Sequence, residues 1–174
     1  MKYLVIIDVQ NDFVSGSLGT AEAVSMLPRL LQKAEDFEGG IIMTKDTHGE
    51  DYLQTQEGRN LPVPHCITGT SGWEFPDELE KLRKKKQAKV YEKSCFGSWE
   101  LAEDIGRLYA EGRLESVELT SLCTDICVVS NALMIKAAAP ELTVYVDASC
   151  CAGVTPEKHE AALEVMRSCQ VIVK

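Results

Sequence analysis

The alternation of short β-rich runs with longer helical patterns most constrains the fold of this chain. The predicted strands are Tyr3–Ile7, Gly40–Thr44, Lys89–Glu92, Ser116–Thr120, Thr143–Val146 and Gln170–Val173, and the predicted helices lie near residues 20–37, 75–86, 98–111, 124–138 and 156–168. Apolar strands that alternate with helices indicate a parallel sheet covered on both faces. We therefore expect an α/β fold with three α/β/α layers around a six-stranded, mainly parallel sheet. The chain has no repeat or linker that would divide it, so we expect one domain over residues 1–174.

Charge and cysteine content exclude several classes of function. The net charge is −9, from 18 basic and 27 acidic side chains, and it argues against a nucleic-acid surface, which needs basic groups. No apolar run approaches the roughly 20 residues that span a bilayer, and the run Tyr3–Ile7 is too short for the core of a signal peptide. The seven cysteines are an odd number and cannot all pair within one chain. We expect reduced thiols in the cytoplasm, with no membrane and no nucleic-acid partner.

One long segment interrupts the alternation. Residues 47–73 show little periodicity and are rich in glycine, proline and polar residues. Loops of this length in compact domains are usually functional or disordered. Two of the three histidines, His48 and His65, lie in this segment, which favours a functional loop.

Ionisable side chains follow the predicted strands where each strand ends. These positions hold Asp8, Asp46 with His48, Lys93, the turn from Ser121 to Cys127, and Asp147. The carboxyl ends of parallel strands meet at one edge of a sheet, and ligands of open α/β sheets bind just beyond that edge. We therefore expect these side chains to converge on a site.

Cys127 follows a strand and a tight turn at the start of a predicted helix. With Thr124 or Asp125 as the N-cap, Cys127 falls in the first helical turn, where the helix dipole favours a thiolate and an adjacent oxyanion. The alternative is a buried apolar cysteine beneath the helix. Asp8 is either a working carboxylate or a cap for the following turn, and Lys93 either stabilises negative charge in the crevice or is a solvated lysine.

Asp46 and His48 lie on one face of an extended segment, where they offer two metal ligands. His65 and Glu57 would complete a site of nitrogen and oxygen ligands suited to zinc, manganese or iron. The alternative is that both histidines only form hydrogen bonds within the long loop.

Together these motifs resemble the isochorismatase-like cysteine hydrolases and, within them, the nicotinamidases. The resemblance rests on four segments in order, which are the opening motif Asp8–Phe13, the metal motif Thr44–His48, the segment Pro64–Phe75 and the nucleophile turn Leu122–Val128. Three features depart from the family pattern. Ser121 replaces a glycine that is usual before the nucleophile turn, Pro62 replaces an aromatic residue, and the segment after Lys93 is short.

The resemblance implies a catalytic triad and a metal centre. Asp8, Lys93 and Cys127 would form the triad, the backbone N–H groups of Cys123 and Cys127 would form the oxyanion hole, and Phe13 would stack on the substrate. A divalent metal, with zinc preferred to manganese or iron, would be held by Asp46, His48 and His65, with Glu57 as a fourth ligand found in only some members. Family members also carry a cis peptide bond in the nucleophile turn, which here falls at Leu122–Cys123.

The expected function is hydrolysis of a small carboxamide through a thioester acyl-enzyme, with nicotinamide as the preferred substrate and nicotinate and ammonia as products. One alternative is hydrolysis of a vinyl ether of the isochorismatase kind, which needs no thiol. Another is a non-catalytic module that binds a metal or a small ligand on the same fold. We also expect a homo-oligomer, with Phe96 and Trp99 either facing a partner subunit or buried in the core.

Overall fold

A six-stranded parallel sheet runs through the molecule. The computed structural model describes residues 1–174. The strands are β1 (Lys2–Ile7), β2 (Gly40–Asp46), β3 (Lys89–Lys93), β4 (Ser116–Leu122), β5 (Thr143–Ala152) and β6 (Ile172–Val173). They lie in the order β3-β2-β1-β4-β5-β6, and every neighbouring pair is parallel. The predicted α/β class and six-stranded parallel sheet are confirmed.

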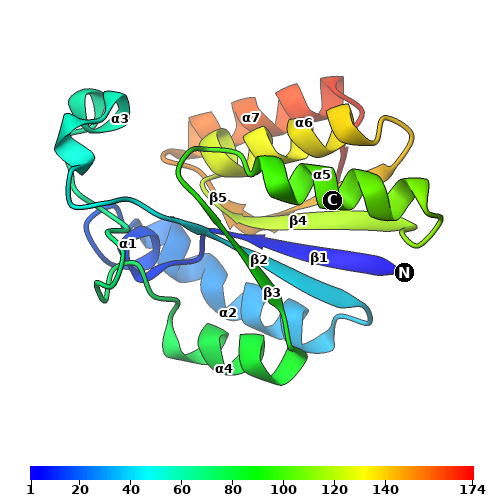
Figure 1. Ribbon diagram of the computed structural model, residues 1–174, viewed down its shortest axis with the longest axis horizontal. Helices are drawn as coiled ribbons and strands as arrows, with labels where there is room; N and C mark the ends of the chain where they lie inside the picture. The colour runs from blue at the N-terminus through cyan, green and yellow to red at the C-terminus, as the bar shows by residue number, and fades with distance from the viewer.

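Helices cover both faces of the sheet, as Figure 1 shows. Helices α2 (Ala21–Asp36) and α4 (Asp77–Lys86) lie on one face, and α5 (Trp99–Ala110), α6 (Val129–Ala138) and α7 (Pro156–Ser168) lie on the other. Each face has its own hydrophobic cluster, with 17 buried residues on the α2 side and 22 on the α5 side. The three predicted layers are therefore present. No helix combines the length and the apolar character needed to cross a membrane.

The chain order creates a crevice at the centre of the sheet. From β1 the chain passes through β2 to β3 at one edge, and it then returns to β4, which pairs with β1 on its other side. The connections from β1 and β4 thus leave in opposite directions, which opens a crevice beyond the carboxyl ends of these strands. In Figure 1 these ends point to the left, toward α1 (Asn11–Val14) and α3 (Gln56–Asn60).

The helix ends follow the sequence signals. Thr20 caps α2, because its hydroxyl accepts the N–H of Ala23 at 3.0 Å. Thr155 caps α7 by accepting the N–H of Lys158 at 3.3 Å, and Pro156 occupies the first turn, where a missing N–H costs nothing.

Two expectations about strand and helix limits are wrong. Strand β5 continues to Ala152, so Asp147 lies within the strand rather than at its exit and does not join the site. Its carboxylate instead pairs with Lys33 of α2 at 2.6 Å. The predicted helix over 124–138 is divided into a π turn, η2 (Thr124–Val128), and α6.

The irregular segment 47–73 has little secondary structure, as expected. It contains only a 3₁₀ turn, η1 (Tyr52–Gln54), and the five-residue helix α3. A buried lysine ties its far end to the sheet, because Lys45 of β2 pairs with Glu74 at 2.8 Å and its Nζ lies 3.6 Å from the ring centre of Trp73. The segment therefore has a defined path over the carboxyl edge of the sheet.

Candidate active site

Three ionisable side chains from different strand ends meet in the buried centre of the crevice. Asp8 directly follows β1, Lys93 ends β3, and Cys127 lies in η2 after β4. The Nζ of Lys93 lies 2.7 Å from Oδ2 of Asp8 and 3.5 Å from Sγ of Cys127. All three residues are buried. The structure thus brings together the three residues that the sequence singled out as a triad.

Polar residues that the sequence interpretation did not single out hold this cluster in place. The hydroxyl of Thr44 in β2 donates a hydrogen bond to Oδ1 of Asp8 at 2.6 Å. The oxygen of that hydroxyl, Oγ1, also accepts the backbone N–H of Asp8 at 3.2 Å. Asn131 of α6 donates its side-chain amide to the carbonyl of Cys127 at 2.8 Å. Both are fully or almost fully buried polar side chains in apolar elements, which is the signal that could have identified them.

The charges in the cluster determine where protons reside. Burial, reinforced by the charge of Asp8, raises the pKa of the Cys127 thiol well above its ordinary value. Burial also raises the pKa of Asp8, although the charge of Lys93 opposes that change. Burial disfavours the Lys93 ammonium, but the negative charges around it raise its pKa above the ordinary value. The charge of Lys93 thus favours the ionised form of Asp8, which lies next to the Cys127 thiol and can accept its proton.

The backbone of the nucleophile turn departs from regular geometry. The peptide bond between Leu122 and Cys123 is cis, as the resemblance implies, and Ser121 just before it has φ 112°. The expectation that Thr124 or Asp125 caps the helix is wrong, because no side chain caps η2. The Thr124 hydroxyl instead bonds His159, and the Asp125 carboxylate accepts the N–H of Val154.

Four potential metal ligands face one another beside this cluster. One ligand atom from each of Asp46, His48, Glu57 and His65 lies within 4.8 Å of the others. Nε2 of His48 lies 2.9 Å from Oδ2 of Asp46, and Nε2 of His65 lies 3.5 Å from the same oxygen and 3.6 Å from Oε1 of Glu57. In a tetrahedral zinc site with bonds of about 2.0–2.1 Å, ligand atoms lie about 3.3 Å apart. The donor set and its spacing therefore fit a divalent metal such as zinc.

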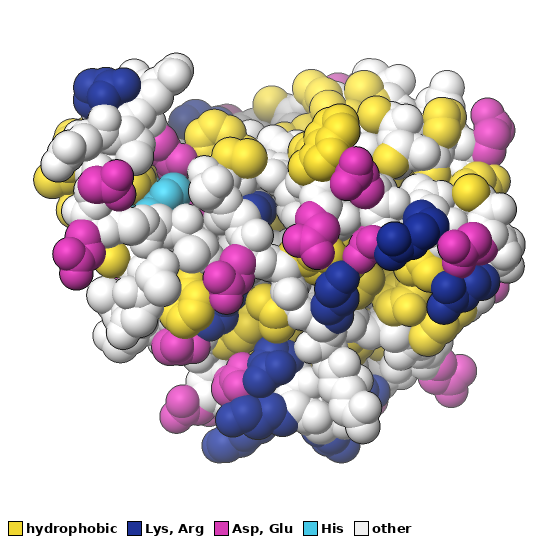
Figure 2. All heavy atoms as spheres, in the orientation of Figure 1, with side chains coloured by type: hydrophobic (Ala, Val, Ile, Leu, Met, Phe, Trp, Pro, Cys, Tyr) yellow, Lys and Arg dark blue, Asp and Glu magenta, His cyan; other side chains and the backbone are white.

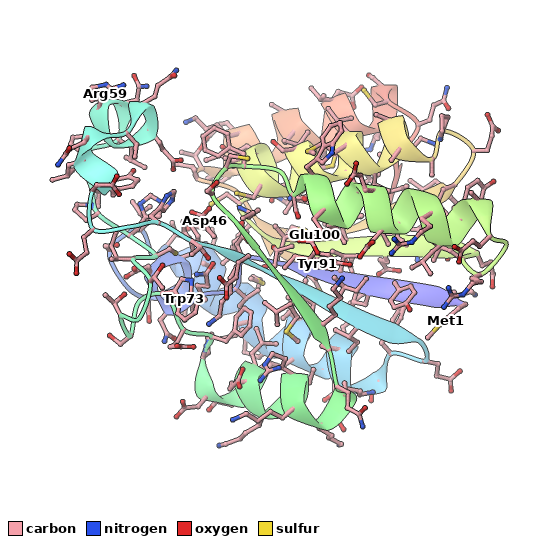
Figure 3. The ribbon with its side chains drawn as sticks, in the orientation of Figure 1. Met1, Asp46, Arg59, Trp73, Tyr91 and Glu100 are labelled. Carbon is pink, nitrogen blue, oxygen red and sulfur yellow. The ribbon has the colours of Figure 1, made fainter.

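Neighbouring groups orient these ligands and connect them to the triad. The Nδ1 of His65 lies 2.9 Å from the carbonyl of Val63, which leaves Nε2 free to face the carboxylates. Oδ1 of Asp46 accepts a hydrogen bond from Lys93 at 3.2 Å, so one carboxylate contacts both groups. Although burial alone would raise the pKa of Asp46, hydrogen bonds from both histidines and the charge of Lys93 hold it below its ordinary value. Figure 3 shows Asp46 at the sheet end from which the segment with Arg59 extends.

Gln10 connects the opening segment to the metal ligands. Its side-chain amide donates to the carbonyl of Asp46 at 2.8 Å, and its side-chain carbonyl accepts the Asp46 N–H at 2.7 Å. A second hydrogen bond from the same amide nitrogen reaches the carbonyl of Trp73 at 3.0 Å. Gln10 thus continues the hydrogen bonding between β1 and β2 beyond the sheet.

A small, largely apolar pocket of about 300 Å³ opens onto both groups. Cys123 and Cys127 lie in its wall, as do the metal-site residues Asp46, Glu57 and His65. The apolar lining consists of Phe13, Leu18, Leu61, Phe96, Ile126 and Val154. This volume is at the lower limit for small-molecule sites and suits a compound of about one ring. In Figure 2 a histidine side chain is visible near acidic side chains on the left of the molecule, beneath the α3 region.

Comparisons with known proteins agree with this geometry. The family model described as the isochorismatase domain matches residues 2–174. A nicotinamidase/pyrazinamidase of Mycobacterium tuberculosis is 29% identical over 186 residues, which cover 98% of this chain and 97% of the relative.

Solved structures superimpose over nearly the whole chain. A pyrazinamidase/nicotinamidase of Streptococcus mutans has a TM-score of 0.83 and 28% identity, with 100% of both chains covered. A pyrazinamidase of Pyrococcus horikoshii in complex with zinc has a TM-score of 0.80 and 26% identity, with 99% of this chain and 98% of the other covered. Because the isochorismatase domain model matches residues 2–174, this chain belongs to the isochorismatase family.

Proposed function

We propose that this protein is a cysteine amidohydrolase that converts nicotinamide to nicotinate and ammonia. The single observation that carries the proposal is the buried contact of Lys93 with both Asp8 and Cys127, because Cys127 also lies in the wall of a one-ring pocket. The names of the relatives support the substrate, since they include nicotinamidases and pyrazinamidases. The pocket's small volume supports a single aromatic ring.

In the proposed reaction Asp8 acts first as a base. Its carboxylate takes the proton of the Cys127 thiol, and the sulfur then forms a bond to the carbonyl carbon of the amide. The N–H groups of Cys123 and Cys127 stabilise the oxyanion, as such donors do in other acyl-transfer sites. Lys93 compensates the negative charge that is present on either Asp8 or the sulfur throughout this step.

Asp8 then acts as an acid. The carbon–nitrogen bond breaks as the proton passes from Asp8 to the departing nitrogen, which leaves as ammonia, and a thioester remains on Cys127. A water molecule gives a proton to Asp8 and adds to the thioester, and the sulfur leaves as a thiol when Asp8 returns the proton. The carboxylic acid is released, and both side chains return to their first state.

Asp46, His48, His65 and Glu57 would hold a divalent metal beside the triad, where three of the four line the same pocket. A bound metal would supply a Lewis acid that anchors a ring nitrogen of the substrate, directly or through water. Phe13 lies in the same wall, with its ring centre 5.4 Å from that of His65, and would pack against the face of the ring. These residues therefore orient the substrate, whereas the triad performs the chemistry.

A panel of amides tests this proposal. Metal-loaded protein is incubated with nicotinamide, pyrazinamide and benzamide, and released ammonia is measured. We expect ammonia from the two ring-nitrogen substrates and a loss of at least about 1,000-fold in the Cys127→Ala variant. Absence of ammonia from every amide with metal-loaded, folded protein would refute the proposal. A thiol alkylator separates it from the vinyl-ether alternative, because only the amidase reaction needs the free thiol.

The assembly state remains a prediction. Trp99 is 70% exposed and Phe96 is 48% exposed, so neither belongs to the core. We propose a homo-oligomer with Trp99 in its interface. Light scattering of the wild type and of Trp99→Glu tests this proposal. We expect a smaller molecular mass for the variant, and a monomer in both proteins would contradict the proposal.

A further inference from the structure

Two side chains of the nucleophile turn form hydrogen bonds with residues at and just before the start of α7. The hydroxyl of Thr124, which is fully buried, lies 2.8 Å from Nδ1 of His159. Next along the turn, Oδ1 of Asp125 accepts the backbone N–H of Val154 at 2.9 Å. The two residues that follow Cys123 therefore both bond to the junction between β5 and α7.

The junction is shaped to allow this close approach. A side chain on Gly153 would place its first carbon 2.9 Å from Oδ1 of Asp125 and 2.9 Å from the backbone nitrogen of His159. Real side-chain carbons essentially never lie so close to such atoms, so a larger residue would push the turn and α7 apart. The two segments are thus in close contact at Thr124, Asp125 and Gly153.

The turn has few other restraints on this side. No side chain caps η2, and its backbone forms a π turn rather than a regular α-helical start. Asn131 and Ser130 of α6 bond the carbonyls of Cys127 and Ile126. Within the turn, the N–H groups of Ile126 and Val128 both reach the carbonyl of Cys123. The side chains of Thr124 and Asp125 bond instead to His159 and Val154. These two side-chain bonds join the first half of the turn to the segment from Val154 to His159, on the side away from α6.

We propose that His159 is a positioning residue that, through Thr124, holds the nucleophile turn so that Sγ of Cys127 stays in contact with Lys93 and Asp8. The third histidine of the chain thus has a role that differs from those of the two metal-site histidines. The inference rests on the proposed amidase function, since the groups being positioned are its nucleophile and its oxyanion donors. A displacement of the order of 1 Å at a reacting group can cost about 100-fold in rate.

Two substitutions of His159 and one of its partner test the role. His159→Leu removes the bond and is expected to lower kcat about tenfold with KM within about twofold, because the substrate pocket is left intact. His159→Asn places an amide where Nδ1 lies and is expected to recover most of that loss. Thr124→Val should reproduce the loss, and the double variant with His159→Leu should show little further decrease, because both remove the same bond. Glu160→Leu, at the next and exposed position of α7, is the matched control and should keep wild-type kcat.

The rate at which iodoacetamide alkylates Cys127, read by mass spectrometry, gives a second readout that needs no turnover. We expect His159→Leu to slow it and His159→Asn to restore it. Wild-type kcat and alkylation rate in a folded His159→Leu variant would overturn the proposal. The proposal would also be overturned if His159→Leu and His159→Asn lost kcat equally and in proportion to a fall in Tm. That result would mean that His159 only stabilises the fold. If wild type releases ammonia from no amide, the proposed function fails, and the alkylation rates still decide the role of His159.

Discussion

Replacing Ser121 with glycine tests whether the backbone before the nucleophile turn is strained. Ser121 is fully buried, has φ 112°, and lies at a shift in the pairing register between β4 and β5. Its backbone N–H bonds Sγ of Cys151 at 3.2 Å, whereas its hydroxyl has no hydrogen-bond partner in the protein. The residue therefore combines an unfavourable φ with an unpaired buried hydroxyl.

The magnitude follows from these two features. An unpaired buried polar group costs about 1–3 kcal/mol, and packing lost on removing its oxygen offsets part of this, so Ser121→Ala should raise the free energy of unfolding by about 1 kcal/mol. A side chain in a sparsely populated region of positive φ costs about 1–3 kcal/mol, and glycine gives back about 0.5–1 kcal/mol through its greater freedom in the unfolded chain. The free energy of unfolding of the Ser121→Gly variant should then be about 1 kcal/mol higher than that of the Ser121→Ala variant.

Thermal unfolding of the three proteins at one metal concentration is the assay. For a chain of this length about 1 kcal/mol corresponds to about 2–4 °C, so Tm should rise by about 2–4 °C in the alanine variant and about 4–8 °C in the glycine variant. A glycine variant no more stable than the alanine variant would refute the claim of backbone strain. A fall in stability for both would refute the claim that the hydroxyl is unpaired.

Three further outcomes are expected from the site and the core. As pH falls, kcat/KM should decline with a midpoint above 3.8, the ordinary carboxyl value, because burial raises the pKa of Asp8 and the base is lost when it is protonated; an acid limb at or below 3.8 in stopped-time ammonia assays would contradict this. Purified protein should contain one divalent metal per chain by elemental analysis, and His65→Ala should lose it together with the metal-dependent rise in Tm. Lys33→Met should lower the free energy of unfolding by about 2 kcal/mol at pH 7, since it leaves the half-buried Asp147 without its partner. Although burial opposes it, the bond to Lys33 lowers the pKa of Asp147, so this stabilisation is present above the unfolded pKa and should disappear in urea titrations as pH falls through the lowered value.

The elements that the sequence predicted well are those whose own residues determine them. Strand β1 is a continuous apolar run, and helix α7 begins with the signal Thr155-Pro156-Glu157. The limits expected from the sequence agree with the structure to within one residue for both elements. The sequence pattern ends strand β5 at Val146, because the residues after it are polar or small. The extension to Ala152 depends on pairing with β4, where Ser121 lies opposite Cys151 and Leu122 opposite Ala152. The π turn could not be predicted either, because the two expected capping side chains, Thr124 and Asp125, bond instead to residues that are distant in the sequence, His159 and Val154.

The site residues were predictable to the extent that topology alone brings them together. Asp8 and the nucleophile turn follow β1 and β4, which are hydrogen-bonded neighbours, so any sheet of this order places them side by side. His65 and Glu57 come from the long loop, and their position beside Asp46 depends on the path of that loop, which has no periodic pattern. Residue type identified these two as candidate metal ligands and the motif resemblance supported them, whereas the geometry of parallel strands brings together Asp8 and the nucleophile turn.

Lys93 shows how the same topology limits the residue type at one position. Neighbouring strands lie about 4.8 Å apart, so the end of β3 is about 10 Å from the end of β1, with β2 between them. A lysine side chain reaches about 6 Å from its Cα and must therefore cross the end of β2 to contact Asp8. Along that path its Nζ also meets Asp46, the last residue of β2, at 3.2 Å. A shorter cation at this position could not reach Asp8, and an uncharged side chain would leave two buried carboxylates facing each other without a counter-charge. In this chain the contact of Lys93 with both Asp8 and the candidate metal ligand Asp46 is thus a consequence of the strand order β3-β2-β1.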